Sequence, residues 1–383
     1  MIILEGPFVS QLLLEYLKRT GIPVLKNKFA EGSATASDID LNFVSDEEMI
    51  SFFKERKRLY AISENALDWI YANIPDKEYI SKINILKDKG EFRKLCRSIY
   101  PDFFFEEVQF DDLDKLDIQK VKMPFVLKPA IGFLSAGVHV VTSETDWKRV
   151  LENLHQDFDT LKDSFFSSVL QKSKFLVEEY IVGDEFAVDA YYNEVGEPVI
   201  VNIFKHPFSS TTDVADRLYY TNKELFVEYA APFKEFLKNI NKVLNIKNIP
   251  FHIEFRANGN VIIPIEVNPM RFAGMCLNDI FKYIDGRHPI DIYLNNLSVD
   301  YNEMWKGKEN VTYSFMVLEK GSGMKDKKLD FEKVKKKFSN VLELRVVDHL
   351  NLNTFGFLLT RTEKENISEL ENFLKLDLKE YTI

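Results

Sequence analysis

The first sixty residues alternate short apolar runs with an amphipathic helical pattern. "MIIL" and "IPVLKN" each have the apolar character of a strand, and "QLLLEYLKRTG" between them places apolar residues at helical spacing before Gly21. This strand–helix–strand order predicts a parallel α/β layer. The first turn lacks G-x-G-x-x-G, so the pattern gives no indication of a dinucleotide site.

The pattern changes after residue 86 and again near residue 305. Residues 87–304 begin with a charged helix, continue through strand-rich sequence, and end with a long helix and a hairpin. Pro232 is a candidate interruption of that helix, and Asn258-Gly259 is the turn signal of the hairpin. Residues 305–383 are predicted as strand, helix, strand, strand and helix. The expected fold class is therefore α/β and α+β, in three domains: 1–86, 87–304 and 305–383.

Two carboxylates and an amide interrupt apolar runs near residue 260. Glu266 and Asn268 lie two residues apart in "IEVNPM", so both side chains would leave the same face of a strand, and Glu254 lies in the run "FHIEF". Hard oxygen ligands of this kind suit Mg²⁺, which takes one or two carboxylates and leaves positions for substrate phosphates. The alternative, the polar face of a half-exposed strand, is equally well supported by this pattern alone.

The magnesium hypothesis requires both carboxylates to lie on the same face of the hairpin. A two-residue turn at Asn258-Gly259 with regular pairing would place Glu254 and Glu266 on opposite faces of the sheet. A longer loop, or a bulge near Pro264, which lacks an N–H donor, would bring the two carboxylates to one face. The hypothesis therefore predicts an irregularity in this hairpin.

A second polar pattern lies in "PFVLKPAIGFLSAGVHVV". Lys128 ends an apolar strand, and a loop of small residues follows, including Gly132, Ser135 and Gly137. The lysine ammonium would contact a phosphate while backbone N–H groups of the loop bind its oxygens. The Walker A motif G-x-x-x-x-G-K-[ST] does not occur. A lysine at a strand end is also common in ordinary strands, so this segment alone does not distinguish a phosphate site from an ordinary strand end.

The segment "LVEEYIVGDEFAVD" offers the groups that adenosine needs. Glu178 would accept the exocyclic amine, the backbone of Glu179 and Ile181 would bind the ring edge, and Glu185 would bind the ribose hydroxyls. An acidic hairpin edge explains the same pattern equally well.

Composition excludes several classes of function. The 383 residues carry a net charge of −10, which argues against nucleic acid or an anionic membrane as the partner. The two cysteines give neither a disulfide framework nor zinc spacing. The N-terminus has no signal-peptide pattern, and no apolar run reaches the roughly 18 residues that span a bilayer. A cytoplasmic protein is therefore expected.

Together, and in this order, the patterns from about Lys87 to Asp279 resemble the ATP-grasp superfamily of carboxylate–amine ligases, which includes D-alanine–D-alanine ligase and biotin carboxylase. The resemblance implies an ATP-grasp fold, with a lid subdomain at about 115–182. A small parallel α/β domain would precede this fold and a small α+β domain would follow it. It also implies ATP and Mg²⁺ (or Mn²⁺) as cofactors.

The resemblance assigns roles to individual residues. Lys89, in "DKGEFR", matches the first phosphate-contacting lysine of the family, and Lys128 matches the second. The adenosine and metal residues named above match the family's adenosine and magnesium ligands. Arg271 resembles the catalytic arginine, but Met270 stands between it and the Asn-Pro pair, whereas the family commonly has N-P-R.

Two further polar residues lie in "FKHPFSSTTDVADRLYYT", the segment that precedes the long helix. Related enzymes place γ-phosphate or substrate contacts in this region, so Arg217 is a third candidate catalytic residue beside Arg271 and Lys128. A loop salt bridge from Arg217 to Asp213 or Asp216 is an equally good interpretation. His206, just before Pro207, is predicted to be a surface-loop histidine rather than a catalytic base.

The resemblance implies a ligase that forms an amide-like bond through an acyl phosphate, converting ATP to ADP and phosphate. Its partners would be a small carboxylate and a small amine, and a homodimer is among the expected assemblies. Two alternatives are a nucleotide-binding regulatory protein without catalysis and an ATP-dependent kinase that acts on a carboxylate.

Overall fold

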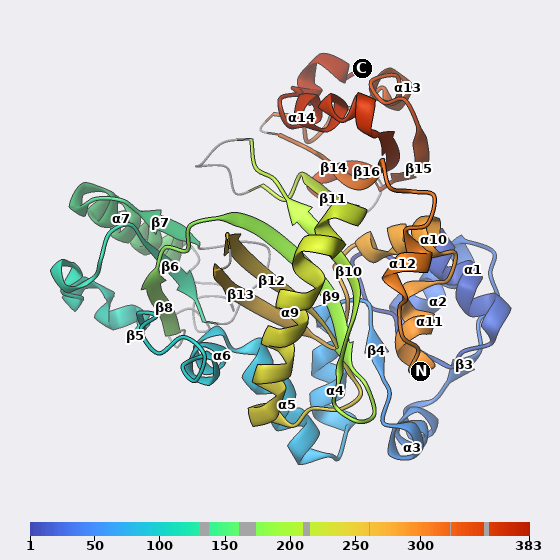
Figure 1. Ribbon diagram of the computed structural model, residues 1–383, viewed down its shortest axis with the longest axis horizontal. Helices are drawn as coiled ribbons and strands as arrows, with labels where there is room; N and C mark the ends of the chain where they lie inside the picture. Colours follow the sequence, from blue (N-terminus) through green and yellow to red (C-terminus); the bar gives the residue numbers. More distant parts are fainter. Residues whose placement is uncertain (131–137, 161–173, 210–214, 260, 322, 348–351) are drawn as a thin grey trace. The chain divides into compact units, whose positions relative to one another are not determined.

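The computed structural model describes residues 1–130, 138–160, 174–209, 215–259, 261–321, 323–347 and 352–383 (Figure 1). The chain forms two compact units. The first comprises Met1–Ile80 and Asp184–Ile383, and the second comprises Ser81–Gly183. Among the described residues, no helix is both long enough and apolar enough to cross a membrane.

The N-terminal part of the first unit is a small parallel sheet in the order β3-β2-β1-β4. This confirms the parallel layer predicted from the strand–helix–strand pattern. Ser10 caps the first helix by accepting a hydrogen bond from the backbone of Leu13, and Gly21 ends it with a left-handed φ of 63°. The elements are β1 (Ile2–Ile3), α1 (Gln11–Thr20), β2 (Val24–Leu25), α2 (Lys28–Ala36), β3 (Phe43–Val44), α3 (Asp46–Arg56), β4 (Tyr60–Ala61), η1 (Glu64–Ala66) and α4 (Leu67–Asn73).

The rest of the first unit is built on an eight-stranded antiparallel sheet in the order β13-β12-β9-β10-β11-β14-β16-β15. Strands from the predicted C-terminal segment continue the sheet that the preceding segment begins, so the compact units do not follow the predicted boundary at residue 305. The strands are β9 (Asp184–Tyr192), β10 (Pro198–His206), β11 (Leu218–Asn222), β12 (Ile249–Asn258), β13 (Val261–Pro269), β14 (Val311–Glu319), β15 (Val341–Val346) and β16 (Thr354–Glu363).

One long helix, α9 (Lys223–Leu244), covers one face of this sheet (Figure 1). The helix continues through Pro232, so the expected interruption does not occur. Its buried aromatic face holds it in place: Phe233 stacks on Phe255 of β12 with ring centroids 4.6 Å apart, and Phe236 meets the same ring edge-on. Because side chains alternate along a strand, Glu254 of β12 leaves the opposite face.

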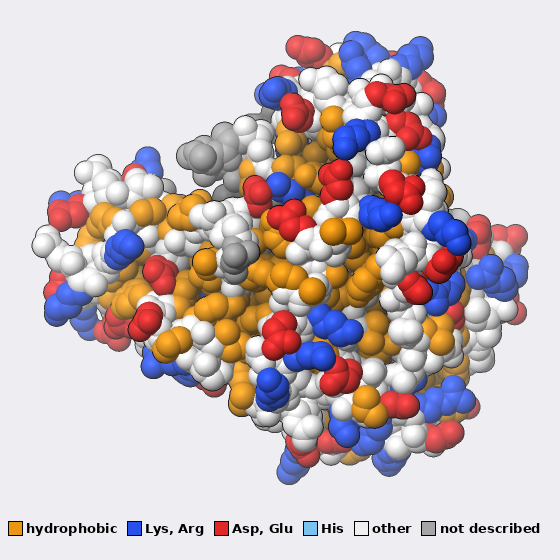
Figure 2. Space-filling model, viewed as in Figure 1, with side chains coloured by type: hydrophobic (Ala, Val, Ile, Leu, Met, Phe, Trp, Pro, Cys, Tyr) orange, Lys and Arg blue, Asp and Glu red, His pale blue; other side chains and the backbone are white. Residues whose placement is uncertain are grey.

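The remaining helices of the first unit are short. They are η4 (Leu277–Asp279), α10 (Ile280–Asp285), α11 (Pro289–Leu294), α12 (Tyr301–Met304), α13 (Phe331–Lys335), η6 (Lys364–Asn366), α14 (Ser368–Leu374) and η7 (Leu378–Tyr381). Around α13, basic and acidic side chains are interspersed (Figure 2), and Lys335 pairs with Glu332 at 2.9 Å.

Gly356 is required where β16 passes β15. A Cβ atom at this position would lie 2.3 Å from the backbone oxygen of Arg345, which cannot move without breaking the strand pairing. We therefore expect Gly356→Ala to lower the free energy of unfolding by about 1–3 kcal/mol, as other overpacked core positions do.

Urea denaturation checks this expectation, with Gly32→Ala as the matched control. Gly32 lies in α2 with nothing within 4 Å of its added Cβ, so alanine there should be neutral or slightly stabilising. Equal denaturation midpoints for the two variants would contradict the close strand approach.

The second unit contains a four-stranded antiparallel sheet in the order β5-β8-β6-β7. Its core includes Phe125, Leu127, Trp147 and Phe175. The elements are α6 (Lys89–Cys96), β5 (Phe105–Gln109), η2 (Phe110–Lys115), η3 (Ile118–Lys120), β6 (Phe125–Pro129), β7 (His139–Val141), α7 (Glu144–Thr160) and β8 (Lys174–Glu179); α5 (Lys77–Lys87) precedes them and begins in the first unit.

Candidate functional site

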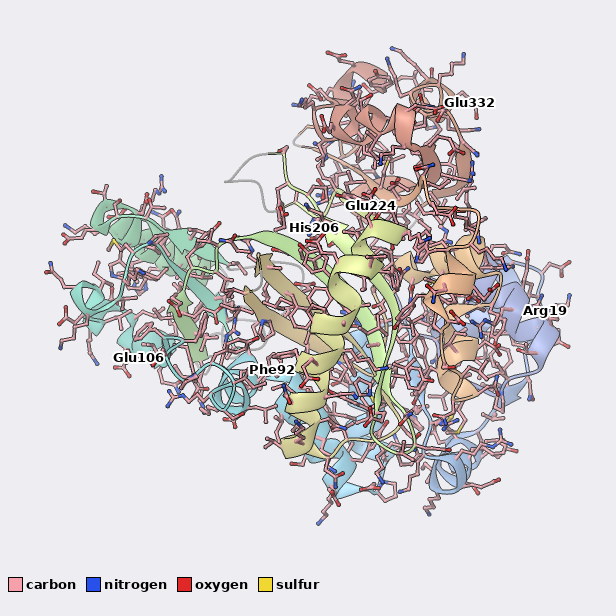
Figure 3. The ribbon with its side chains drawn as sticks, viewed as in Figure 1. Arg19, Phe92, Glu106, His206, Glu224 and Glu332 are labelled. Carbon is pink, nitrogen blue, oxygen red and sulfur yellow. The ribbon has the colours of Figure 1, made fainter. Side chains whose placement is uncertain are left out.

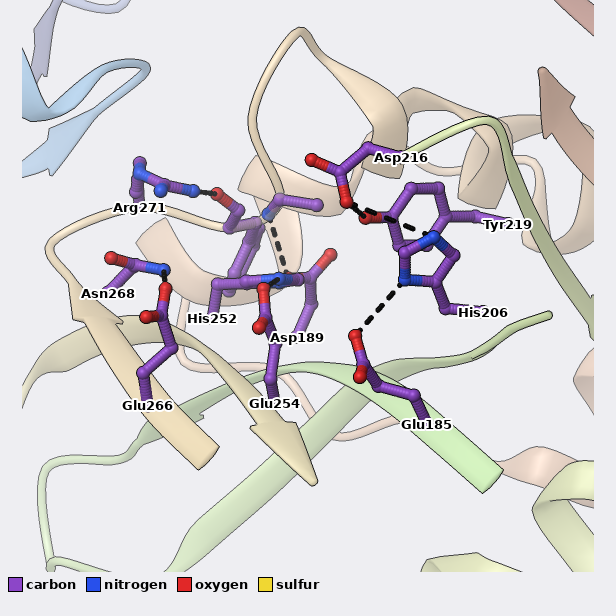
Figure 4. A network of polar contacts seen from close by, with 12 residues as sticks. Glu185, Asp189, His206, Asp216, Tyr219, His252, Glu254, Glu266, Asn268 and Arg271 are labelled. Atoms are coloured by element: carbon purple, nitrogen blue, oxygen red, sulfur yellow. Dashed lines mark hydrogen bonds and ion pairs between the residues drawn. The ribbon is translucent and has the colours of Figure 1, made fainter. Parts of the chain in front are cut away.

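The hairpin of β12 and β13 contains the irregularity that the magnesium hypothesis predicts. Phe255 pairs with Pro264 but Glu254 pairs with Glu266, so Ile265 is the additional residue of a β-bulge. Directly opposed residues project from the same face of a sheet. Glu254 and Glu266 therefore lie on one face, on neighbouring strands (Figure 4).

Asn268 lies on the same face and contacts one of the two carboxylates. Its Nδ2 atom donates a hydrogen bond to Oε1 of Glu266 at 3.1 Å. Burial, and then the nearby Glu266 carboxylate, raise the pKa of Glu254, although His252 acts in the opposite direction. Two facing carboxylates repel each other, and a divalent cation would remove that repulsion.

The chemistry of these donors fits Mg²⁺. Within the described part of the chain, no group of three or more His, Cys, Asp or Glu side chains is arranged to hold a metal ion. The protein therefore offers two carboxylates and an amide, which is a small donor set. Mg²⁺ commonly uses one or two carboxylates and fills its remaining positions with water and substrate phosphates.

A buried histidine adjoins Glu254 on β12. His252 donates from Nδ1 to Oδ1 of Asp189 at 2.8 Å, and its Nε2 lies 3.5 Å from Oε1 of Glu254. Burial acts to lower the pKa of His252, but the contacts with Asp189 and Glu254 outweigh it and raise the pKa to about 9. Asp189 also accepts a hydrogen bond from the backbone of Ala273 at 2.8 Å.

Glu185, the candidate ribose ligand, lies between two basic side chains. His206 approaches Oε1 through Nδ1 at 3.2 Å, and Arg256 donates to Oε2 from Nη2 at 3.1 Å. Burial opposes ionisation of this carboxyl, but His206 and then Arg256 outweigh it and lower the pKa of Glu185.

His206 is not a surface-loop residue, and that prediction is wrong. It ends β10 (Figure 3), is only 3% exposed, and stacks on Tyr219 with ring centroids 4.2 Å apart (Figure 4). Burial lowers the pKa of His206, but Glu185 and then Asp216 outweigh it, so the pKa is raised overall. A following proline indicated a loop, whereas pairing of β10 with β9 extends as far as His206.

Met270 explains how Arg271 is placed one residue later than in the N-P-R pattern. Met270 is fully buried and has a left-handed φ of 72°, so the chain turns sharply at the end of β13. Arg271 then reaches Glu64 of η1, with Nη2 2.7 Å from Oε1, and also donates to the backbone of Phe272. Figure 4 shows Arg271 on the same side as Asn268.

The structure gives Arg217 a different set of contacts. Its guanidinium donates to the backbone oxygens of Phe373, Leu374 and Leu376 and lies over the Phe373 ring, at the C-terminal end of α14. These contacts cap a helix, which favours a structural role. Asp216 accepts instead from the Tyr219 hydroxyl at 2.9 Å, and Asp213 lies outside the described residues.

In the second unit, Lys128 and Glu178 form the centre of a buried charged cluster. Arg93 Nε donates to Oε2 of Glu178 at 2.6 Å, and Lys128 Nζ lies 2.5 Å from Oε1. All three side chains are at most 4% exposed. Burial opposes ionisation of Glu178, but Arg93 and Lys128 outweigh it and lower its pKa to about 2.

A third cation, Lys89, adjoins this cluster. Burial lowers the pKa of Lys128; Glu178 counteracts this, but neighbouring Arg93 and Lys89 lower it further. Lys89 begins α6, is 8% exposed, and donates its backbone N–H to the oxygen of Ala130 at 3.0 Å. Cations gathered in a buried site favour an anionic ligand.

Of the other predicted adenosine and phosphate residues, the structure describes two. Glu179 accepts a hydrogen bond from the backbone of Phe104 at 3.2 Å, and Ile181 is buried. Gly132, Ser135 and Gly137 lie outside the described residues.

Sequence reasoning missed four charged residues of these clusters: Arg93, Asp189, His252 and Glu64. Arg93, Asp189 and Glu64 join these clusters through contacts between distant parts of the chain; Arg93 and Glu178, for example, are 85 residues apart. The signal that could have found His252 is its place in "FHIEF", where it shares a strand face with Glu254.

Comparisons with known proteins show which proteins the chain is similar to. Residues 121–279 match the family described as ATP-grasp domain. No curated protein matches the sequence. The L-amino acid ligase from Bacillus licheniformis has a similar structure, with a TM-score of 0.70 and 16% identity, over 100% of this chain and 97% of that one.

Two further solved structures share the fold. N5-carboxyaminoimidazole ribonucleotide synthetase from Thermotoga maritima gives a TM-score of 0.63 at 15% identity, over 100% of this chain and 98% of that one. The biotin carboxylase domain dimer of the Hydrogenobacter thermophilus 2-oxoglutarate carboxylase, in complex with MgADP, ADP and bicarbonate, gives 0.60 at 11% identity, over 94% and 86%. The predicted fold class is therefore confirmed.

Proposed function

We propose that this chain, which has the ATP-grasp fold and carries an ATP-grasp domain over residues 121–279, is an ATP-dependent carboxylate–amine ligase. The observation that carries the proposal is the β-bulge that places Glu254 opposite Glu266 on the face that also bears Asn268. These three residues would hold Mg²⁺ or Mn²⁺. When bound, the ion would supply positive charge to the triphosphate and lower the barrier to phosphoryl transfer.

The nucleotide contacts proposed for the second unit follow from its charge. Lys128 and Lys89 would bind phosphate oxygens, because they gather with Arg93 in a buried cluster of cations. Glu178 holds Lys128 in place and would also face the adenine amine, with the backbone of Glu179 and Ile181 at the ring edge. In the first unit, Glu185 would bind ribose hydroxyls from the position that His206 and Arg256 give it.

The reaction proposed has two steps. An oxygen of the substrate carboxylate attacks the γ-phosphorus of ATP, the bond to the β-phosphate oxygen breaks, and ADP leaves with an acyl phosphate formed. The amine nitrogen then attacks the acyl carbon, phosphate leaves with the carboxylate oxygen, and the amine loses a proton. Arg271, oriented by Glu64, would stabilise the oxyanion of the second step. One such contact is typically worth about 3 kcal/mol.

The partners proposed are a small carboxylate and a small amine, since the ligase and synthetase relatives act on small molecules by name. A homodimer is proposed because one neighbour is a domain dimer. A cytoplasmic location is proposed from two free cysteines, Cys96 and Cys276, which fit a reducing compartment.

Phosphate release from ATP tests the proposal directly. The purified chain should release phosphate with Mg²⁺ only when a pool of L-amino acids supplies both carboxylate and amine. Hydroxylamine should divert the reaction to a hydroxamate. Hydroxamate formation, with a rate of phosphate release that does not depend on the amine, would instead support a carboxylate kinase. Nucleotide binding without any turnover would support the regulatory alternative.

A further inference from the structure

We infer that His252 and Asp189 form a positioning pair that orients the Glu254 carboxylate for its cation, an inference that rests on the proposed function. His252 lies two residues before Glu254 on β12, and Asp189 lies directly opposite His252 on β9. All three side chains therefore share one face of the sheet (Figure 4).

The contacts form a continuous chain that ends at Glu254. The backbone N–H of Ala273 donates to Oδ1 of Asp189 at 2.8 Å, the same oxygen accepts from Nδ1 of His252 at 2.8 Å, and Nε2 of His252 lies 3.5 Å from Oε1 of Glu254. Asp189 is fully buried and His252 is 6% exposed, so neither side chain has room to turn.

The two candidate metal ligands are oriented by different neighbours. Glu266 accepts a hydrogen bond from Asn268, its neighbour on the same strand. Glu254 stands opposite Ala187 on β9, whose methyl group offers no polar contact. Among the described residues, its ion pair is with His252. His252 therefore orients Glu254 as Asn268 orients Glu266.

The chain of contacts also reaches the loop that carries Arg271. Ala273, which donates to Asp189, lies two residues after Arg271. Asp189 thus fixes the backbone beside the proposed catalytic arginine and the histidine beside the proposed metal ligand. Partners of metal ligands typically contribute about 10–100-fold to metal affinity, because they hold the ligand in one orientation.

Two substitutions of His252 distinguish a positioning role from simple core packing. In His252→Asn, the short amide keeps a donor near Asp189 but does not reach Glu254. In His252→Gln, the longer amide places a donor nearer to Glu254. We expect His252→Asn to weaken Mn²⁺ binding by about 10–100-fold and His252→Gln to recover much of that loss.

The measurement is a titration of the full chain with Mn²⁺ in the presence of ADP, followed by the electron paramagnetic resonance of free Mn²⁺. His155→Asn, an exposed histidine of the second unit that pairs with Asp114, is the matched control and should bind as the wild type does. The Mg²⁺ concentration that half-saturates phosphate release should rise in His252→Asn, with the KM for ATP at saturating Mg²⁺ unchanged.

Each result decides something. Wild-type affinity in both His252 variants, or an equal loss in both, would overturn the positioning role, because unfolding or lost packing affects the two alike. Absence of Mn²⁺ binding by the wild-type chain would overturn the proposed function itself, which keeps the two failures distinguishable.

Discussion

Glu266→Gln should lower the rate of ATP-dependent phosphate release by on the order of a thousandfold while leaving the fold intact. The charge that a metal ion supplies to phosphoryl transfer is worth several kcal/mol, and each factor of ten in rate corresponds to about 1.4 kcal/mol. Glutamine keeps the oxygen that accepts from Asn268, so the strand face is preserved. Steady-state kinetics over a wide Mg²⁺ range measures the effect.

The stability of this variant is an independent check. Burial and then the facing Glu266 carboxylate raise the pKa of Glu254, so removing one charge should leave the melting temperature of the metal-free protein unchanged or higher. Glu363→Gln, on β16 of the same sheet and paired with Arg361, is the matched control and should keep full activity. Unchanged turnover in Glu266→Gln would contradict the metal assignment.

Glu178→Gln should destabilise the second unit by about 3–5 kcal/mol, because it leaves Arg93 and Lys128 buried without their counter-ion. Urea denaturation measures the loss, and hydrogen exchange should become faster in β6 and β8, which Lys128 and Glu178 join. Glu91→Gln on α6 removes an exposed partner of Lys94 and should cost at most about 1 kcal/mol. Equal effects of the two substitutions would show that the buried cluster carries no such energy.

The pH dependence of the same substitution has a defined sign. The pKa of Glu178 is lowered to about 2 in the folded protein, so its contribution is complete above its unfolded pKa of 4.5 and is lost as the pH falls towards 2. That shift corresponds to about 3 kcal/mol. The stability difference between wild type and Glu178→Gln should therefore shrink on acidification through this window, and a difference that stays constant would contradict the ion pairing.

Local patterns predicted the parts of the fold that depend on neighbouring residues. The parallel layer, the helix between its first two strands and the hairpin of β12 and β13 follow from periodicity and turn chemistry. The bulge was required by the hypothesis rather than visible in the sequence, because only strand pairing determines that Glu254 opposes Glu266. Lys128 and Glu178 were found separately, and their contact arises from the pairing of β6 with β8.

The residues that sequence patterns misplaced share a physical cause. His206 was assigned to a loop because proline follows it, yet pairing with β9 and stacking on Tyr219 bury it. Pro232 was a candidate break in α9, yet aromatic packing on the sheet holds the helix through it. Arg217 stays a candidate catalytic residue, but its contact with the end of α14, 157 residues further along the chain, could not be seen in the sequence. Long-range contacts decide all three.

Oxygen transfer tests the central claim most directly. A pool of L-amino acids labelled with ¹⁸O in both carboxylate oxygens, supplied with ATP and Mg²⁺, should yield phosphate that carries one labelled oxygen per molecule, seen by mass spectrometry. The label reaches phosphate only if a carboxylate oxygen attacks the γ-phosphorus and remains with phosphorus when the amine displaces it. Phosphate whose new oxygen comes from water would contradict the ligase mechanism and the role given to Glu254, Glu266 and Asn268.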